Sequence, residues 1–274
     1  MASSFISVRP LASPSEYETY FQLANQAFSS DPSPTNARDW QEFITTLPQY
    51  RPEQLRGAFR DGGLLGGYIL YERMMRVGAA QLPTGCIGAV VTHPAYRHQG
   101  VATALMYDAI DYALSHQHAL LLLDGIPKFY HRFGYSDVFD LSILDIERAA
   151  ILAQPLSTHT VHLATPEDAA SVLALYDRHF GPYAGSFTRT LEQQTHRLQH
   201  RSSDNPLWVA VDPAGGPQGY ISLQGGTYLS ISTLKKKEQV DVESCVSSIE
   251  DARPIRPRCA SEAGRLPAPV FSYL

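Results

Sequence analysis

A short run of residues in the first half of the chain combines an arginine with two small residues at a spacing that suits anion binding. The run reads Arg97-x-x-Gly100-x-Ala102 and lies where an apolar stretch gives way to a helical pattern. The first amides of a helix have no partners inside the helix, and its N-terminus carries roughly half a positive charge. Small side chains also let a ligand come close to the backbone. The run therefore predicts a cradle for phosphate groups.

The elements on either side of this run are predicted to be a strand and a helix. Residues 86–92 are nearly all apolar, which predicts a strand buried on both faces. The glycine-rich patterns typical of nucleotide hydrolysis and dinucleotide binding are absent from the sequence. After Pro94, apolar residues recur at steps of three and four, as in a helix: Ala102, Leu105, Met106, Ala109, Ile110 and Ala113.

This strand, loop and helix resemble part of the GNAT superfamily of acetyltransferases, which typically reads V-x-P-x-Y-R-x-x-G-x-[GA]-x-x-L. The stretch THPAYR at 92–97 matches, together with Gly100, Ala102 and Leu105, and only Thr92 departs by replacing the leading valine. A second motif of the superfamily, F-Y-x-x-x-G-[FY], matches residues 129–135. The resemblance implies an α/β (α+β) GNAT fold, a mixed twisted central sheet flanked by helices.

The resemblance also implies where acetyl-CoA binds and how the reaction ends. Strand residues would pair with the pantetheine arm, and the amides of the loop would hold the pyrophosphate. Tyr130 matches the tyrosine that protonates the departing CoA thiolate in many members, a task that suits a phenol with a reference pKa of about 10. An aromatic core residue is the alternative interpretation of Tyr130. The expected cofactor-binding residues are Val90, Val91, Thr92, Arg97, His98, Gln99, Gly100, Val101, Ala102 and Thr103.

A general base is not identified by the sequence. Many members of the superfamily carry a glutamate on the strand before the phosphate loop, but residues 86–92 contain no carboxylate. Glu72 and Asp124 are candidates, although both are more readily interpreted as structural or solvated carboxylates. Cys86 is interpreted as a buried hydrophobic residue and His93 as part of the loop. Direct attack of an amine on a thioester needs no protein nucleophile, because strand amides can polarise the carbonyl group.

The first half, residues 1–150, is expected to form the catalytic GNAT domain. Ser13 and Glu16, around a proline, form a capping box that predicts a helix running to Phe28. A second helix is predicted over 37–47 from its apolar spacing.

A hairpin should follow these helices. Its turn is predicted at Asp61-Gly62-Gly63, because Asp-Gly supplies the positive φ that such turns require. The next long strand is expected to begin near Cys86.

The opening of the chain recurs after 152 residues. Twelve of the 59 positions from 11 to 69 are identical in the second copy, against about three or four expected from background composition. We therefore expect residues 151–226 to form a degenerate and incomplete GNAT-like repeat. Residues 227–274 form a tail of unassigned structure, either an end that no longer matches its ancestral sequence or a flexible extension.

The second copy is expected to bind no acetyl-CoA. A second phosphate loop would begin near residue 249, where Ile249, Ala252 and Pro254 replace the arginine and the two small residues. Such a loop would lack the close backbone approach that a pyrophosphate needs.

Composition limits the classes of function. The chain has 274 residues, of which 44% are hydrophobic and 18% charged, as expected for folded domains. A net charge of -5 gives no general attraction for nucleic acid and favours cationic partners. The sequence shows neither a secretory leader nor a membrane-spanning run, so we expect a cytoplasmic protein with no membrane partner. Three widely spaced cysteines indicate neither a disulfide framework nor a metal site.

The sequence thus predicts an N-acetyltransferase that moves an acetyl group from acetyl-CoA to a primary amine of a small-molecule or peptide acceptor. The alternatives are a non-catalytic acyl-CoA-binding or sensing module and a structural protein built from degenerate copies; a homo-oligomer is compatible with each. The RFGY ending and the second copy resemble tandem-GNAT aminoglycoside acetyltransferases of the enhanced-intracellular-survival type, whose acidic pocket accepts cationic amines. Those enzymes use their C-terminal carboxylate as base, a role not carried over to this chain.

Overall fold

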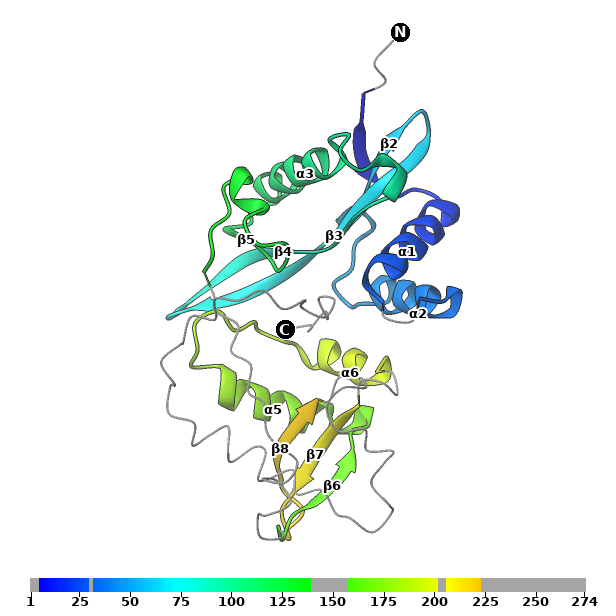
Figure 1. Ribbon diagram of the computed structural model, residues 1–274. Coiled ribbons are helices and arrows are strands. Elements are labelled where there is room, and N and C mark those ends of the chain that lie inside the picture. Colours follow the sequence, from blue (N-terminus) through cyan, green and yellow to red (C-terminus); the bar gives the residue numbers. More distant parts are fainter. Residues whose placement is uncertain (1–4, 30–31, 139–156, 202–205, 223–274) are drawn as a thin grey trace, which may run out of the picture. The chain divides into compact units, whose positions relative to one another are not determined.

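The computed structural model describes residues 5–29, 32–138, 157–201 and 206–222, which fall into two compact units (Figure 1). Unit 1 contains the described residues up to Val138 together with Tyr183–Thr188, and unit 2 contains the other described residues from 157 onward. The expected domain boundary at 150 and the expected tail at 227–274 lie outside the described residues.

Unit 1 is built on a mixed sheet, as the GNAT resemblance implies. Neighbouring strands run antiparallel except for the last pair, β4 and β5, which is parallel. The strand order is β1-β2-β3-β4-β5. The strands are β1 (Ser7–Pro10), β2 (Leu55–Arg60), β3 (Gly63–Val77), β4 (Ala80–Thr92) and β5 (Leu120–Leu123).

The hairpin between β2 and β3 confirms the predicted turn. Asp61 and Gly62 have φ angles of 50° and 80°, the positive pair that a tight hairpin turn requires. The expected start of the next strand near Cys86 is wrong, because β4 begins six residues earlier at Ala80. Pro83 lies in this first part of β4, opposite Met74 of β3, and a proline normally argues against a strand interior.

Three helices cover the sheet: α1 (Pro14–Phe28), α2 (Pro34–Thr45) and α3 (Val101–Ser115). Helix α1 has the predicted bounds, and the Ser13 hydroxyl accepts a hydrogen bond from the Glu16 amide at 3.3 Å. The Glu16 carboxylate accepts from the Ala12 amide at 2.7 Å, one residue earlier than a capping box requires. Helix α2 begins three residues before the predicted 37, because Ser33 caps it ahead of a proline just as Ser13 caps α1.

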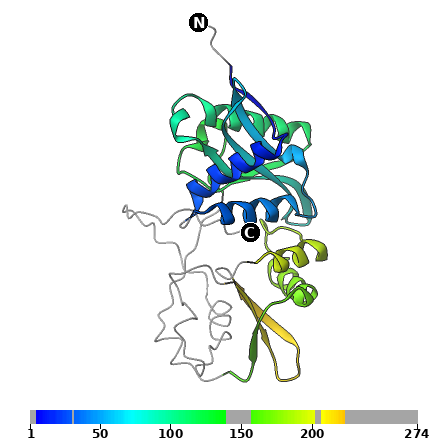
Figure 2. The same ribbon diagram turned by 90° about the vertical axis from the view of Figure 1, so that its right-hand side faces the viewer.

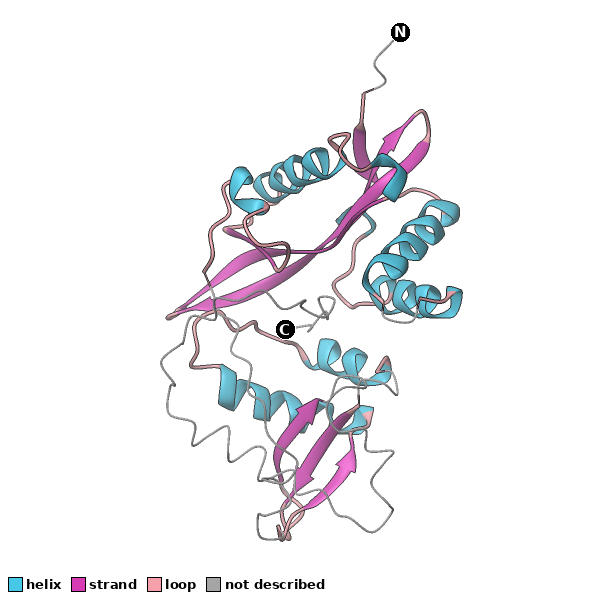
Figure 3. Cartoon of the chain, in the orientation of Figure 1, coloured by secondary structure: helices cyan, strands magenta, loops and turns pink. Residues whose placement is uncertain are grey.

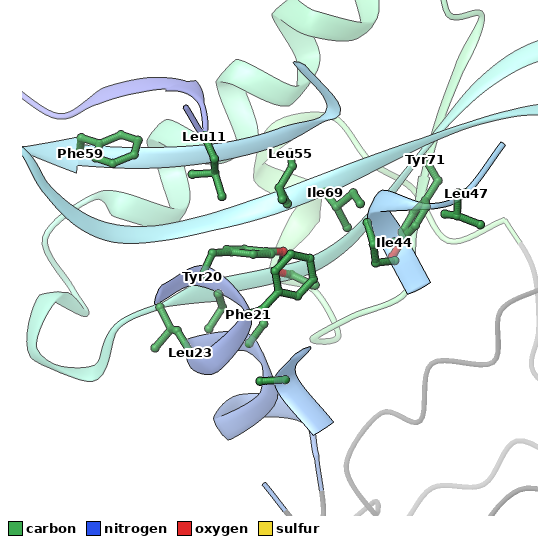
Figure 4. Close-up of a cluster of buried hydrophobic side chains, with 14 residues drawn as sticks. Leu11, Tyr20, Phe21, Leu23, Ile44, Leu47, Leu55, Phe59, Ile69 and Tyr71 are labelled. Atoms are coloured by element: carbon green, nitrogen blue, oxygen red, sulfur yellow. Dashed lines mark hydrogen bonds between the residues drawn. The ribbon is translucent and has the colours of Figure 1, made fainter. Parts of the chain in front are cut away.

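Helices α1 and α2 lie on one face of the sheet and α3 lies on the other (Figures 1, 2 and 3). Each face has its own apolar core, and Figure 4 shows the core beneath α1 and α2. Buried members of that core include Leu11, Tyr20, Phe21, Ile44, Leu55, Ile69, Ala89 and Val91. The core beneath α3 includes Leu65, Tyr68, Leu70, Ile87, Val101, Leu105 and Met106.

Polar contacts fix α3 on the sheet. Asp108 in the middle of α3 accepts hydrogen bonds from the Arg56 guanidinium, one of them at 2.8 Å, and from the Tyr68 hydroxyl at 2.8 Å. Burial raises the pKa of Tyr68, so its hydroxyl stays a neutral donor. Because these partners come from β2 and β3, the position of the α3 N-terminus is set by the sheet.

Unit 2 repeats the element order of the first half of unit 1. Its three strands form an antiparallel sheet in the order β6-β7-β8, as β1, β2 and β3 do. The elements are β6 (Thr160–Leu163), α5 (Ala169–Phe180), α6 (Leu191–Gln199), β7 (Leu207–Val211) and β8 (Pro217–Ser222).

The strand registers of the two units differ by one residue. In unit 1, Ala58 of β2 pairs with Val8 and Gly66. Its counterpart in unit 2 is Ala210 (58 + 152), which pairs with Val161 and Gly219 rather than with residues 160 and 218. A shift of one residue exchanges the faces of a strand. The ungapped alignment of the sequences therefore does not match structurally equivalent positions on the outer strands.

Candidate functional site

The loop from β4 to α3 places the start of the helix at the predicted phosphate cradle. Gly100 precedes the first residue of α3 and has a φ of 84°, in the left-handed region that favours glycine. No heavy atom lies within 4 Å of where a Cβ on Gly100 would be. The backbone conformation therefore favours a glycine here, and its surroundings are open. The Gly100 carbonyl accepts the first helical bond, from Ala104 at 2.9 Å.

Side-chain contacts hold this loop in shape. The His93 ring nitrogen Nδ1 accepts from the Ala95 amide at 3.2 Å, as expected for a residue of the loop. Gln99 donates to the Ala95 carbonyl at 3.1 Å and accepts from the Arg60 guanidinium at 2.8 Å. The Arg97 amide donates to the Pro94 carbonyl at 3.4 Å.

Arg60 was not identified from the sequence. It lies at the end of β2, far along the chain from the loop, so only the register of the sheet brings its charge beside Gln99.

The edge of β4 separates from β5 before the loop. The two strands pair only from Thr84–Leu120 to Ile87–Leu123, and β5 ends there. Val90, Val91 and Thr92, the expected pantetheine-binding residues, come after the last pair. The strand therefore presents a backbone edge that β5 does not cover.

Tyr130 lies beside the end of β5. It begins a short 3-10 turn, Tyr130–Phe133, which ends at Gly134 with a φ of 91°. A Cβ on Gly125 would be 2.9 Å from the Tyr130 hydroxyl oxygen, so the phenol lies directly against the backbone two residues after β5. The structure thus places Tyr130 near the point where β4 and β5 separate.

The surroundings of Tyr130 favour its protonated form. Burial raises the pKa of Tyr130, and the negative charge of Asp124 raises it further. The neighbouring aromatic residues Phe133 and Tyr135 pack with Tyr130 against the core beneath α3. A half-buried phenol that stays protonated can donate a proton to an anion in front of it.

The candidate bases differ in their contacts. The Glu72 carboxylate forms an ion pair with Arg51 and accepts from the Tyr112 hydroxyl at 3.2 Å. Asp124 is exposed. Cys86 is partly buried against the core beneath α1 and α2, not fully buried as expected, and burial raises the pKa of its thiol to about 11, so the thiol is neutral near pH 7.

Two further properties concern only the described part of the chain. It holds no group of three or more His, Cys, Asp or Glu residues placed to share a metal ion. None of its helices has the length and apolar character needed to cross a membrane.

Comparison with known proteins agrees with this geometry. Residues 7–138 match the family model described as an acetyltransferase (GNAT) domain. No curated protein matches the sequence. Among solved structures, a GCN5-related N-acetyltransferase from Anabaena variabilis aligns with a TM-score of 0.60 at 16% identity, over 80% of this chain and 54% of that one.

Two other solved structures are also similar in fold. Eis1 from Mycobacterium abscessus aligns with a TM-score of 0.53 at 22% identity, over 80% of this chain and 53% of that one. Saccharomyces cerevisiae N-myristoyltransferase with bound myristoyl-CoA aligns with a TM-score of 0.57 at 14% identity, over 83% of this chain and 63% of that one. The chain therefore spans little more than half the length of such structures.

The fold and the family match together define the class of protein. A mixed sheet with a separated β4 edge, followed by a helix that starts at a left-handed glycine, is the GNAT arrangement. Residues 7–138 therefore form a GNAT acetyltransferase domain by both sequence match and fold.

Proposed function

We propose that this protein is an acyltransferase, which moves an acetyl group from acetyl-CoA to the primary amine of a small-molecule or peptide acceptor. The observation that carries the proposal is the convergence of three features on one end of the sheet in unit 1. They are the uncovered edge of β4, the left-handed Gly100 at the start of α3, and the Tyr130 phenol beside the end of β5.

The donor would lie along β4 with its phosphates at α3. Backbone groups of Val90 to Thr92 would pair with the pantetheine arm, because β5 leaves that edge uncovered. The amides from His98 to Thr103 would hold the pyrophosphate, with Gly100 giving the chain its turn into the helix, whereas the expected Arg97 amide already donates to Pro94. Arg60, held beside the loop by Gln99, adds a positive charge near the phosphates.

The reaction needs one proton donor and one proton acceptor. The neutral amine attacks the thioester carbon, the new C–N bond forms and the C–S bond breaks. The Tyr130 hydroxyl gives its proton to the leaving CoA thiolate and recovers one from water. The amine nitrogen loses its extra proton to a base, for which Asp124 is better placed than Glu72, because Arg51 and Tyr112 already hold the Glu72 carboxylate.

A cationic amine is the favoured acceptor, because the chain carries a net charge of -5. The degenerate repeat is expected to bind no acetyl-CoA of its own.

The test separates catalysis from simple acyl-CoA binding, which the same cradle would also serve. Thiol release from acetyl-CoA is measured across a panel of primary amines with the parent protein and with Tyr130→Phe. We expect Tyr130→Phe to lower turnover by about 10- to 10⁴-fold with little change in cofactor affinity, because a proton donor acts mainly in the transition state.

Tyr107→Phe is the matched control, since Tyr107 is an exposed tyrosine on α3 outside the proposed site. It should keep the parent rate. Binding of acetyl-CoA without thiol release for any amine would show a binding module instead of an enzyme. An unchanged rate in Tyr130→Phe, with chemistry shown to limit turnover, would remove Tyr130 from the mechanism.

A further inference from the structure

A buried tyrosine of α1 contacts β4 at a bulge beside the proposed cofactor edge. The Tyr20 side chain is fully buried, and its hydroxyl donates to the Ala89 carbonyl oxygen at 3.0 Å. Gly67 pairs with Val91 and Ile69 pairs with Gly88. Two residues of β4, Ala89 and Val90, therefore stand opposite one residue of β3, which is the pattern of a β-bulge.

The bulge is in a backbone conformation that an alanine does not favour. Ala89 has a φ of 48°, inside the left-handed region where a Cβ is unfavourable. Such a conformation persists only where the surrounding structure holds it. The carbonyl that accepts the hydrogen bond from Tyr20 belongs to this same residue, Ala89.

Packing fixes the direction of the Tyr20 hydroxyl. A Cβ on Gly67 would be 2.8 Å from the Tyr20 ring, so the ring lies against bare backbone of β3. The Phe21 ring packs edge-on against it at a centroid distance of 5.2 Å. Figure 4 shows Tyr20 between α1 and the strands of the sheet. The hydroxyl therefore meets the Ala89 carbonyl from the α1 side of the sheet.

This bond sets the direction of the next amide. In a trans peptide the C=O and the following N–H point in opposite directions, and the described chain contains no cis peptide bond. Because the Ala89 carbonyl points toward α1, the Val90 N–H points toward the other side of β4. That is the side on which Val90 packs in the same core as Tyr130.

We propose that Tyr20 is a positioning residue for acyl transfer, which holds the bulge so that the Val90 amide faces the carbonyl oxygen of the bound thioester. The inference rests on the proposed function. A donor that is already aimed at the oxygen stabilises the charge that develops there during attack, and it acts more strongly in the transition state than in the bound substrate. Tyr20 touches no substrate and acts only through the backbone.

The test compares Tyr20→Phe with Tyr17→Phe. Both tyrosines lie on α1 and both hydroxyls are hydrogen-bonded, but Tyr17 bonds to the Tyr50 hydroxyl at 2.9 Å, away from β4. Tyr20→Phe should lower kcat by about 10- to 100-fold while the Kd for acetyl-CoA changes less than about twofold. Tyr17→Phe should change neither quantity.

Hydrogen exchange gives a readout that does not depend on activity. Amides at 88–91 should exchange faster in Tyr20→Phe than in the parent and in Tyr17→Phe, because the bulge loses its support. Adding Ala89→Gly should reduce the kcat loss caused by Tyr20→Phe, since a glycine adopts this conformation without help.

The outcomes separate this proposal from the proposed function. A parent that releases no thiol with any amine contradicts the proposed function, while exchange at 88–91 still decides whether Tyr20 holds the bulge. Parent-like kcat in Tyr20→Phe, or unchanged exchange at 88–91, overturns the positioning role. A loss of activity that appears only as weaker acetyl-CoA binding also overturns it.

Discussion

Units 1 and 2 begin with the same arrangement: a short strand, a capped helix, and a carboxylate that ties the helix start to the strand. In unit 1 the carboxylate is Glu16, which Arg9 of β1 binds through two hydrogen bonds of 3.0 and 2.7 Å. In unit 2 it is Asp168, and His162 of β6 lies 3.2 Å from each of its oxygens. The two openings thus solve the same structural problem with related residues.

The sequences of the two halves differ after the hairpin. Unit 1 continues into β4, the loop with Gly100, and α3. The corresponding loop in the second half is expected near residue 249, outside the described residues, where the sequence has Ile249, Ala252 and Pro254. We therefore propose that the opening is a scaffold shared by both halves, and that the strand, loop and helix that follow it in unit 1 carry the chemistry.

The largest expected effect comes from blocking the cradle in unit 1. Gly100→Glu should abolish acetyl-CoA binding and turnover, because it adds a negative charge beside the pyrophosphate and forces a side chain into left-handed backbone. Isothermal titration with acetyl-CoA measures the loss.

Unit 2 offers a matched control in Gly215. Gly215 also has a left-handed φ, 87° against 84° for Gly100, and no heavy atom lies within 4 Å of its added Cβ. Gly215→Glu therefore carries the same backbone strain and charge but should leave acetyl-CoA affinity unchanged. If both variants lose affinity equally, or Gly100→Glu binds like the parent while folded, the cradle is misplaced.

Much of unit 1 could be predicted from sequence because its signals are local. The cap at Ser13, the Asp61-Gly62 turn and the helical spacing after Pro94 each depend on neighbours in the chain. Ser33 gave the same signal as Ser13, a serine before a proline, and could have located the start of α2.

The remaining features depend on contacts between distant segments. The early start of β4 is supported by pairing with β3, which outweighs the proline at Pro83. The bond from Tyr20 to Ala89 and the position of Arg60 beside Gln99 arise only when helix and sheet pack together. The pairing of Phe187 with Met75 at the far end of β3 has no sequence signal either.

A smaller effect, on the stability of the fold at low pH, is expected at the two helix caps. The hydrogen bonds from Arg9 lower the pKa of Glu16 to about 2, against the opposing effect of burial. A carboxylate in an unfolded chain has a pKa of about 4.3. The folded state therefore binds fewer protons between these values, and the stabilisation is present above about pH 4.3 and lost as the pH falls toward 2.

Thermal unfolding of the parent and of Glu16→Gln at pH 5 and pH 3 tests this linkage. The parent should lose more stability on acidification than Glu16→Gln, by about 1 kcal/mol or less, because the pair is partly exposed to water. The corresponding variant in unit 2 is Asp168→Asn. The partner of Asp168 is His162, which is charged only when protonated. Equal acid sensitivity of the parent and Glu16→Gln would show that the Arg9 pair contributes nothing.

The number of acetyl-CoA molecules bound by the full chain tests most directly the claim that one half carries the chemistry. Saturation binding by isothermal titration should give one equivalent per chain in the parent and none in Gly100→Glu. Two equivalents in the parent, or one equivalent that persists in Gly100→Glu, would show that the second half holds a working cofactor site.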